Sequence, residues 1–286
     1  MCNITNQQYG KQDNKHIHVE LADIRSTVQA EFFGEQSNIE DSDEVRQAQE
    51  KIDIEGATFD NLLALAKNLC NQLRYREAIV CCQKALEMKP NSYEARRLLA
   101  IRYLSTGQAD KALKIFGSLK DESADKLDIA YRISLCHFYM ADYEQAKENF
   151  CDTLAMCKEN HEMYIAALYW YICCIVRLNQ DVEEALKELY FPMKITHHAG
   201  YDLVIRLFLG ASPEELEQDS QTDNLTRVMY LFGLYHYYLW KGENHMAQEV
   251  FLRALDCDEY WASFSGLGIW YLYKMQEKKS SCYISP

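Results

Sequence analysis

The chain has 286 residues, and its hydrophobic fraction of 48% is enough for one or two sizeable cores. Its 43 acidic and 30 basic residues give a formal net charge of −13. Because phosphate binding needs clustered Lys and Arg, this charge argues against nucleic acid and against an anionic membrane as partners. Only 11 glycines and 4 prolines punctuate the sequence, which predicts long helices rather than many short strands.

Residues 1–58 are predicted to form an acidic, partly disordered leader. Residues 31–60 carry ten carboxylates against two cations, a net charge of −8. Residues 16–33 could form an amphipathic helix with an apolar stripe at Ile17, Leu21, Ile24 and Val28. Two interpretations stay open: the leader is disordered, or it folds back and occupies a groove on the rest of the chain.

The leader lacks an apolar signal-peptide core, and the sequence contains no run of about 18 apolar residues that would span a membrane. A cytoplasmic location is therefore expected. The eleven cysteines agree with it, because they form no CxxC pair. We expect them to be reduced packing residues, including the adjacent pairs at 81–82 and 173–174, rather than disulfides or metal ligands.

Residues 59–160 repeat with a period of 34. A small residue at Ala78 returns at Ala112 and Ala146, each on an apolar helical face. The segments before them also stay in phase, and Gly107 and Pro90 lie where helices must end. Three helix pairs are predicted at residues 59–92, 93–126 and 127–160.

The second half of the chain is less regular. Residues 161–192 are predicted to form a fourth, divergent helix pair, and residues 193–226 an irregular connection with short helices near 201–209 and after Ser212. A fifth helix pair follows at 227–260. Residues 261–278 are predicted to form a helix that covers the end of the array, as terminal helices of repeat proteins do.

The 34-residue helix pairs, with small residues at the crossing points and a closing proline, resemble the tetratricopeptide repeat (TPR). The resemblance covers residues 59–278, weakly over 191–226. It implies an all-α fold: a right-handed α-solenoid of about five TPR helix pairs with a C-terminal capping helix. It also implies that the first helix of each pair lines a concave groove that binds a protein or peptide segment.

Carrying the contact positions of TPR grooves onto this sequence gives a set of candidate partner-binding residues. They are Lys67, Arg97, Tyr131, Trp170, Arg177, Phe232 and His236. An aromatic groove with a few cations suits a segment with apolar anchors and an acidic group. For Trp170 and Phe232 the alternative, burial between repeats, stays open. Only Lys67 and Arg97 resemble the clamp with which some TPR domains hold C-terminal carboxylates, so that activity is not expected.

The sequence shows no catalytic or nucleotide-binding motif, and we expect no enzyme activity, cofactor or metal. A site built on His197, His198 and Tyr201 is the enzymatic alternative. The expected function is a non-enzymatic scaffold or adaptor. A regulator whose superhelix changes on binding a peptide is the second candidate. The exposed ends of a solenoid also allow a homodimer.

Overall fold

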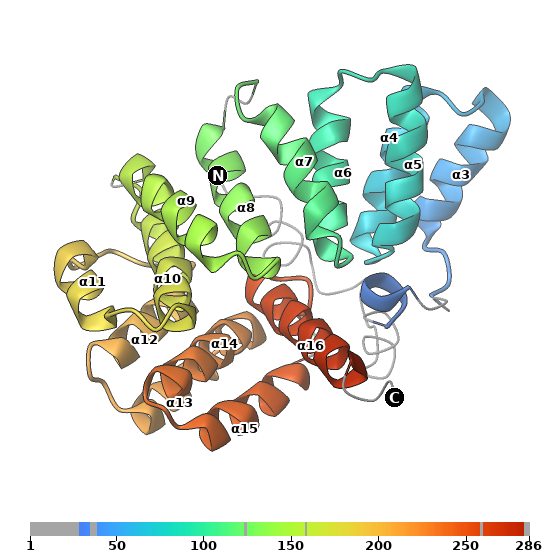
Figure 1. Ribbon diagram of the computed structural model, residues 1–286. Coiled ribbons are helices and arrows are strands. Elements are labelled where there is room, and N and C mark those ends of the chain that lie inside the picture. The colour runs from blue at the N-terminus through green and yellow to red at the C-terminus, as the bar shows by residue number, and fades with distance from the viewer. Residues whose placement is uncertain (1–28, 35–38, 123–124, 158, 258–259, 283–286) are drawn as a thin grey trace. The chain divides into compact units, whose positions relative to one another are not determined.

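The computed structural model describes residues 29–34, 39–122, 125–157, 159–257 and 260–282. Within them lie fourteen α-helices, α3 to α16, and one π-helical turn, η1 (Figure 1). The described residues contain no strand, which confirms the all-α class. The chain divides into two compact units, Met1–Ile129 and Ala130–Pro286. None of the described helices combines the length and apolar character that a membrane crossing demands.

The first unit contains η1, α3, two complete helix pairs and the first turn of α8. Its elements are η1 (Gln29–Phe33), α3 (Asp43–Glu55), the pair α4 (Phe59–Asn71) and α5 (Tyr75–Met88), and the pair α6 (Tyr93–Ser105) and α7 (Ala109–Leu119). Each of the helices α3 to α6 packs against the next one along the chain. Ser42, Thr58 and Ser92 cap α3, α4 and α6 by accepting a hydrogen bond from a first-turn amide.

Helix α3 was not anticipated, because its sequence is acidic and was assigned to the leader. Only Val45 in it is buried. It is held by its Ser42 cap and by contact with α4, where the Asn68 amide donates to the Glu44 carbonyl at 3.0 Å. The predicted amphipathic helix at 16–33 lies outside the described residues, except for η1.

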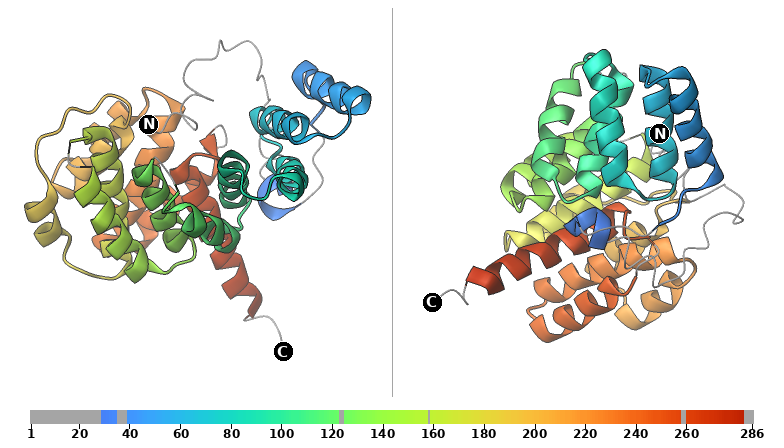
Figure 2. Two further views of the ribbon diagram at one scale, coloured as in Figure 1. Left: turned by 90° about the horizontal axis from the view of Figure 1, so that it is seen from above. Right: turned by 90° about the vertical axis from the view of Figure 1, so that its right-hand side faces the viewer.

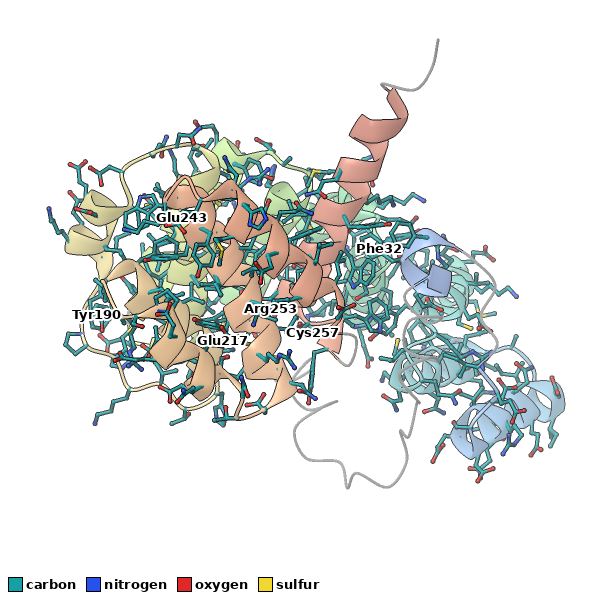
Figure 3. The ribbon with its side chains drawn as sticks, turned by 90° about the horizontal axis from the view of Figure 1, so that it is seen from below. Phe32, Tyr190, Glu217, Glu243, Arg253 and Cys257 are labelled. Atoms are coloured by element: carbon teal, nitrogen blue, oxygen red, sulfur yellow. The ribbon has the colours of Figure 1, made fainter. Side chains whose placement is uncertain are left out.

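The second unit contains most of α8 and the remaining helices. They are α8 (Lys126–Tyr139), α9 (Tyr143–Met156), α10 (His161–Arg177), α11 (Val182–Leu189), α12 (Ala199–Phe208), α13 (Pro213–Ser220), α14 (Asn224–Trp240), α15 (Asn244–Leu255) and α16 (Phe264–Cys282). Ser212 caps α13 with Pro213 in its first turn, as predicted. An ion pair between Arg253 on α15 and Glu217 on α13 joins two of these helices (Figure 3).

Five helix pairs turn in the same way. In each, one residue between the helices takes a positive φ: Leu73, Gly107, Ala141, Asn179 and Gly242, with φ between 53° and 76°. The next amide donates to the carbonyl five residues earlier at 2.9–3.0 Å, as the Arg74 amide does to Leu69. The first three turns are 34 residues apart. The repeat period is therefore a local backbone geometry as well as a packing pattern.

The 193–226 segment is more ordered than the sequence indicated. Helices α12 and α13 form a short pair that packs on α14. Gly210 between them has φ 101°, and the Ala211 amide donates to the Arg206 carbonyl at 3.0 Å. This segment therefore repeats the helix–turn–helix geometry of the flanking pairs with shorter helices.

Candidate protein-interaction site

The structure divides the seven candidate residues into two groups. Lys67 is exposed, and Arg97 and Arg177 are half-buried. The other four are buried, with at most 1% of the surface of each exposed: Tyr131, Trp170, Phe232 and His236. Trp170 and Phe232 are therefore core residues, which is the alternative interpretation of burial between repeats. In this conformation a partner can touch only the three cationic side chains.

Two of the three cations are paired with an acid on the first helix of the next repeat. The Lys67 ammonium lies 2.6 Å from Glu94, and more than half of each side chain is exposed. Arg97 donates through Nε and Nη2 to the Asp128 carboxylate, at 3.2 and 2.5 Å, and Asp128 is only 4% exposed. An exposed pair contributes about 0–1 kcal/mol and is easily exchanged, whereas a buried pair is costly to break. Lys67 is thus the cation that a partner can engage.

The third cation, Arg177, is held by aromatic neighbours. Its guanidinium lies 5.0 Å from the centre of the Tyr143 ring and donates to the Tyr235 hydroxyl at 3.3 Å. Next to it, His236 is completely buried, and this burial, helped by the Arg177 charge, lowers its pKa to about 3. The neutral ring donates from Nδ1 to the Phe232 carbonyl at 2.8 Å. These groups form a largely buried polar cluster, so Arg177 is less open to a partner than Lys67 is.

Three of the buried candidates, Tyr131, Trp170 and Phe232, lie against helix α16. We call the sides of α8, α10 and α14 that meet α16 the first-helix face. Tyr131 on α8 contacts Phe264 edge-on, with ring centres 5.5 Å apart. Tyr139, the last residue of α8, donates its hydroxyl to the Phe264 carbonyl at 2.6 Å and stacks on Tyr271, with ring centres 4.6 Å apart.

The contact of α16 with α10 and α14 is made close by a glycine. A Cβ atom at Gly268 would lie 2.7 and 2.8 Å from two ring carbons of Phe232 and 3.3 Å from Trp170. On α10, the Tyr169 hydroxyl is 3.4 Å from Ser265. Helix α16 also packs on α15 (Figures 1 and 2). It therefore covers the end of the array, as predicted, and in addition occupies the first-helix face.

A second segment docks on the first unit. The Glu31 carboxylate accepts the backbone amide of Arg76 at 2.6 Å, and the Arg76 guanidinium donates to the carbonyls of Glu31 and Phe32 at 2.7 and 3.4 Å. Phe32 is completely buried (Figure 3 labels it on η1). Burial raises the pKa of Glu31 to about 7, although Arg76 opposes this shift. No local pattern in the sequence indicates this contact, since Glu31 is one of ten acidic residues between positions 31 and 60.

The alternative catalytic site around His197 and His198 is a structural loop. Glu162 accepts the amides of Thr196, His197 and His198 and the Thr196 hydroxyl. Burial of Glu162 acts to raise its pKa, but hydrogen bonds from His198, Thr196 and His197 outweigh this effect and hold the pKa well below its usual range. Tyr201 stacks on His198 with ring centres 5.4 Å apart. The carboxylate thus fixes the loop after α11.

The cysteines of the described residues behave as small apolar side chains. Nine of them, from Cys70 to Cys257, have described side chains; these are free thiols, and six are buried. Burial raises the pKa of Cys82 to about 12 and that of Cys157 to about 11. No group of three or more His, Cys, Asp or Glu side chains in the described part of the chain is arranged to hold a metal ion.

These features define a class: the protein is an α-helical repeat protein whose helix pairs are of the TPR type. Residues 71–153, which include α5 to α8 and most of α9, match the family of the anaphase-promoting complex, cyclosome, subunit 3, whose repeats are TPR-type. This match spans 83 of the 286 residues.

Other comparisons add little. One similar solved structure is that of Naa15/Naa10 bound to HypK-THB, with 17% sequence identity and a TM-score of 0.33. The match covers 88% of this chain and 39% of that one, so the chain spans well under half of the length of its structural neighbour. A TM-score this low carries no argument about partner or activity. No curated protein sequence matches the chain.

Proposed function

We propose that the protein is a non-enzymatic scaffold that binds segments of other proteins along the first helices of its TPR-type pairs. The observation that carries this proposal is α16 itself. The first-helix face of the second unit holds this helix through edge-on and stacked aromatic contacts, and through close approach at Gly268. Such a face has the apolar anchors that helix recognition requires.

In the first unit, the partner site that we propose is centred on Lys67 of α4. Its pair with Glu94 is exposed, so an incoming carboxylate can replace Glu94 at a cost of about 1 kcal/mol or less. Arg97 is the less available cation, because it neutralises the buried Asp128. The expected ligand is therefore a segment with an acidic group at Lys67 and apolar anchors nearby.

Photo-crosslinking from single positions tests this proposal. A photoreactive residue at position 64 on α4, one turn before Lys67, probes the first helices, and one at position 80 on α5 is the matched control. The native residues, Ala64 and Val80, are both exposed. In a lysate, a partner should crosslink at 64 and not at 80, and Lys67→Glu in the same chain should lower the yield, because the acidic group of the partner would then meet a carboxylate. Equal labelling at the two positions would contradict binding on the first helices.

A peptide-responsive regulator is the second candidate function. The docking of η1 on α5 favours it, because a segment of the chain that binds its own repeats can compete with a partner.

A further inference from the structure

The segment Glu31–Gly34 wraps around one arginine. The Arg76 backbone amide donates to the Glu31 side chain, and the Arg76 guanidinium donates to two successive carbonyls of the segment. Gly34 then turns the chain away with φ +87°, and a Cβ atom there would lie 3.3–3.4 Å from the guanidinium. Glu31 and Phe32 are therefore bound by a single side chain and its own amide, and Gly34 passes close to the same guanidinium.

The Glu31 carboxylate also completes the start of helix α5. Arg74, which precedes the helix, makes no side-chain capping bond, so the first-turn amides have no local acceptor of that kind. The carboxylate accepts one of these amides and sits at the positive end of the helix dipole. Helix α5 thus obtains its cap from a residue 45 positions away along the chain.

The charges around Glu31 come from three helices. Arg76 and Glu77 belong to α5, Cys70 belongs to α4, and Arg102 of α6 lies against Cys70. Arg102 is itself buried and lies over the Tyr75 ring at 4.2 Å. Burial raises the pKa of Glu31 more than Arg76 lowers it, and Glu77 adds to the rise, so the site receives the side chain chiefly as a hydrogen-bond acceptor for the Arg76 amide.

We propose that this place on the first unit is a binding site for segments of the form Glu-Phe-x-Gly, occupied in cis by residues 31–34 and open to the same motif in a partner protein. This inference goes beyond the proposed function, because the site lies at the start of α5, a second helix of a pair, and it names one class of ligand. The acid caps α5, two backbone carbonyls bind the Arg76 guanidinium, the aromatic residue is buried, and glycine permits the turn. The cis segment is then an autoinhibitory ligand, because a tethered segment competes at an effective concentration on the order of millimolar.

The test uses the full chain and a labelled peptide, acetyl-QAEFFG-amide, which copies residues 29–34. Two substitutions weaken the cis ligand in different ways: Glu31→Ala removes the cap, and Gly34→Val strains the turn against Arg76. Glu31→Ala should let the peptide bind about tenfold more tightly than it binds the wild type, the effect expected for loss of one hydrogen bond from the cis segment, and Gly34→Val should change the affinity in the same direction. Arg76→Ala in the Glu31→Ala chain should weaken binding again by about tenfold.

Hydrogen exchange at the Arg76 amide gives an independent measure of occupancy. This amide should lose protection in the Glu31→Ala chain and regain it with excess peptide, and a peptide with Ala in place of Glu should not restore it. Absence of saturable binding to the folded variants, or equal binding with and without Arg76→Ala, would overturn the proposal. So would loss of cooperative melting in both variants, since the segment would then be part of the core. None of these results affects crosslinking at position 64 on α4, which tests the scaffold function separately.

Discussion

Replacing Gly268 by alanine measures how closely α16 is held on the first-helix face. In an unstrained helix, Gly→Ala stabilises by about 1 kcal/mol, because alanine loses less backbone entropy on folding. At Gly268 the new methyl group would lie 2.7–2.8 Å from the Phe232 ring, well inside the usual carbon–carbon contact of about 3.5–4.0 Å. Overpacking of this kind costs about 1–3 kcal/mol. The net change in the free energy of unfolding should therefore lie between about zero and a loss of 2 kcal/mol.

The assay is urea denaturation followed by tryptophan fluorescence, with Gly117→Ala as the matched control. Gly117 lies inside α7, and nothing lies within 4 Å of the position of its added Cβ atom, so this substitution should give the helical gain alone. The control is followed by circular dichroism. Combining Gly268→Ala with Phe232→Leu should recover part of the loss, as expected for residues in contact. A gain of about 1 kcal/mol for Gly268→Ala alone would refute the contact with Phe232.

Three further predictions concern single groups. Lowering the pH from 7 towards 4.5 should increase the exchange protection of the Arg76 amide, after correction for intrinsic exchange rates. Burial raises the pKa of Glu31 to about 7, so protonation of this side chain favours the docked segment. Glu31→Gln should remove this pH dependence. Glu162→Gln should lower the free energy of unfolding by about 1 kcal/mol at neutral pH. Because the pKa of Glu162 is held below its usual range, the difference from wild type should narrow on acidification below pH 4.5 in chemical denaturation. Gly242→Ala should cost about 1 kcal/mol and Ala141→Gly should gain up to about 1 kcal/mol, since both positions have positive φ; equal changes in melting temperature would contradict this assignment.

The helix pairs could be predicted from the sequence because their signals are local. The spacing of Ala78, Ala112 and Ala146 sets the crossing points, and the structure adds left-handed turns with the same period at Leu73, Gly107 and Ala141. Two of these turn residues are not glycine, so composition alone did not reveal the turns.

The segments and side chains that contact the first helices could not be predicted in the same way. An apolar side chain on a first helix looks the same whether it meets a partner or the chain's own α16. The available signal was the pair Gly266 and Gly268 in a terminal helix, which indicates close approach to another element but does not name it. Likewise, the sequence marked Lys67 and Arg97 as cations without showing that Glu94 and Asp128 pair with them.

A buried thiol in each unit can report how often that unit opens. Cys82 in the first unit and Cys136 in the second are completely buried, and burial raises the pKa of both thiols, so neither reacts readily while the helices stay packed. An alkylating reagent in excess would therefore label each thiol at the rate at which its own unit opens. Mass spectrometry of the two labelled peptides would follow both openings in one sample, without any engineered probe. A ligand that stabilises only one unit would lower the alkylation rate of the thiol in that unit and leave the other rate unchanged.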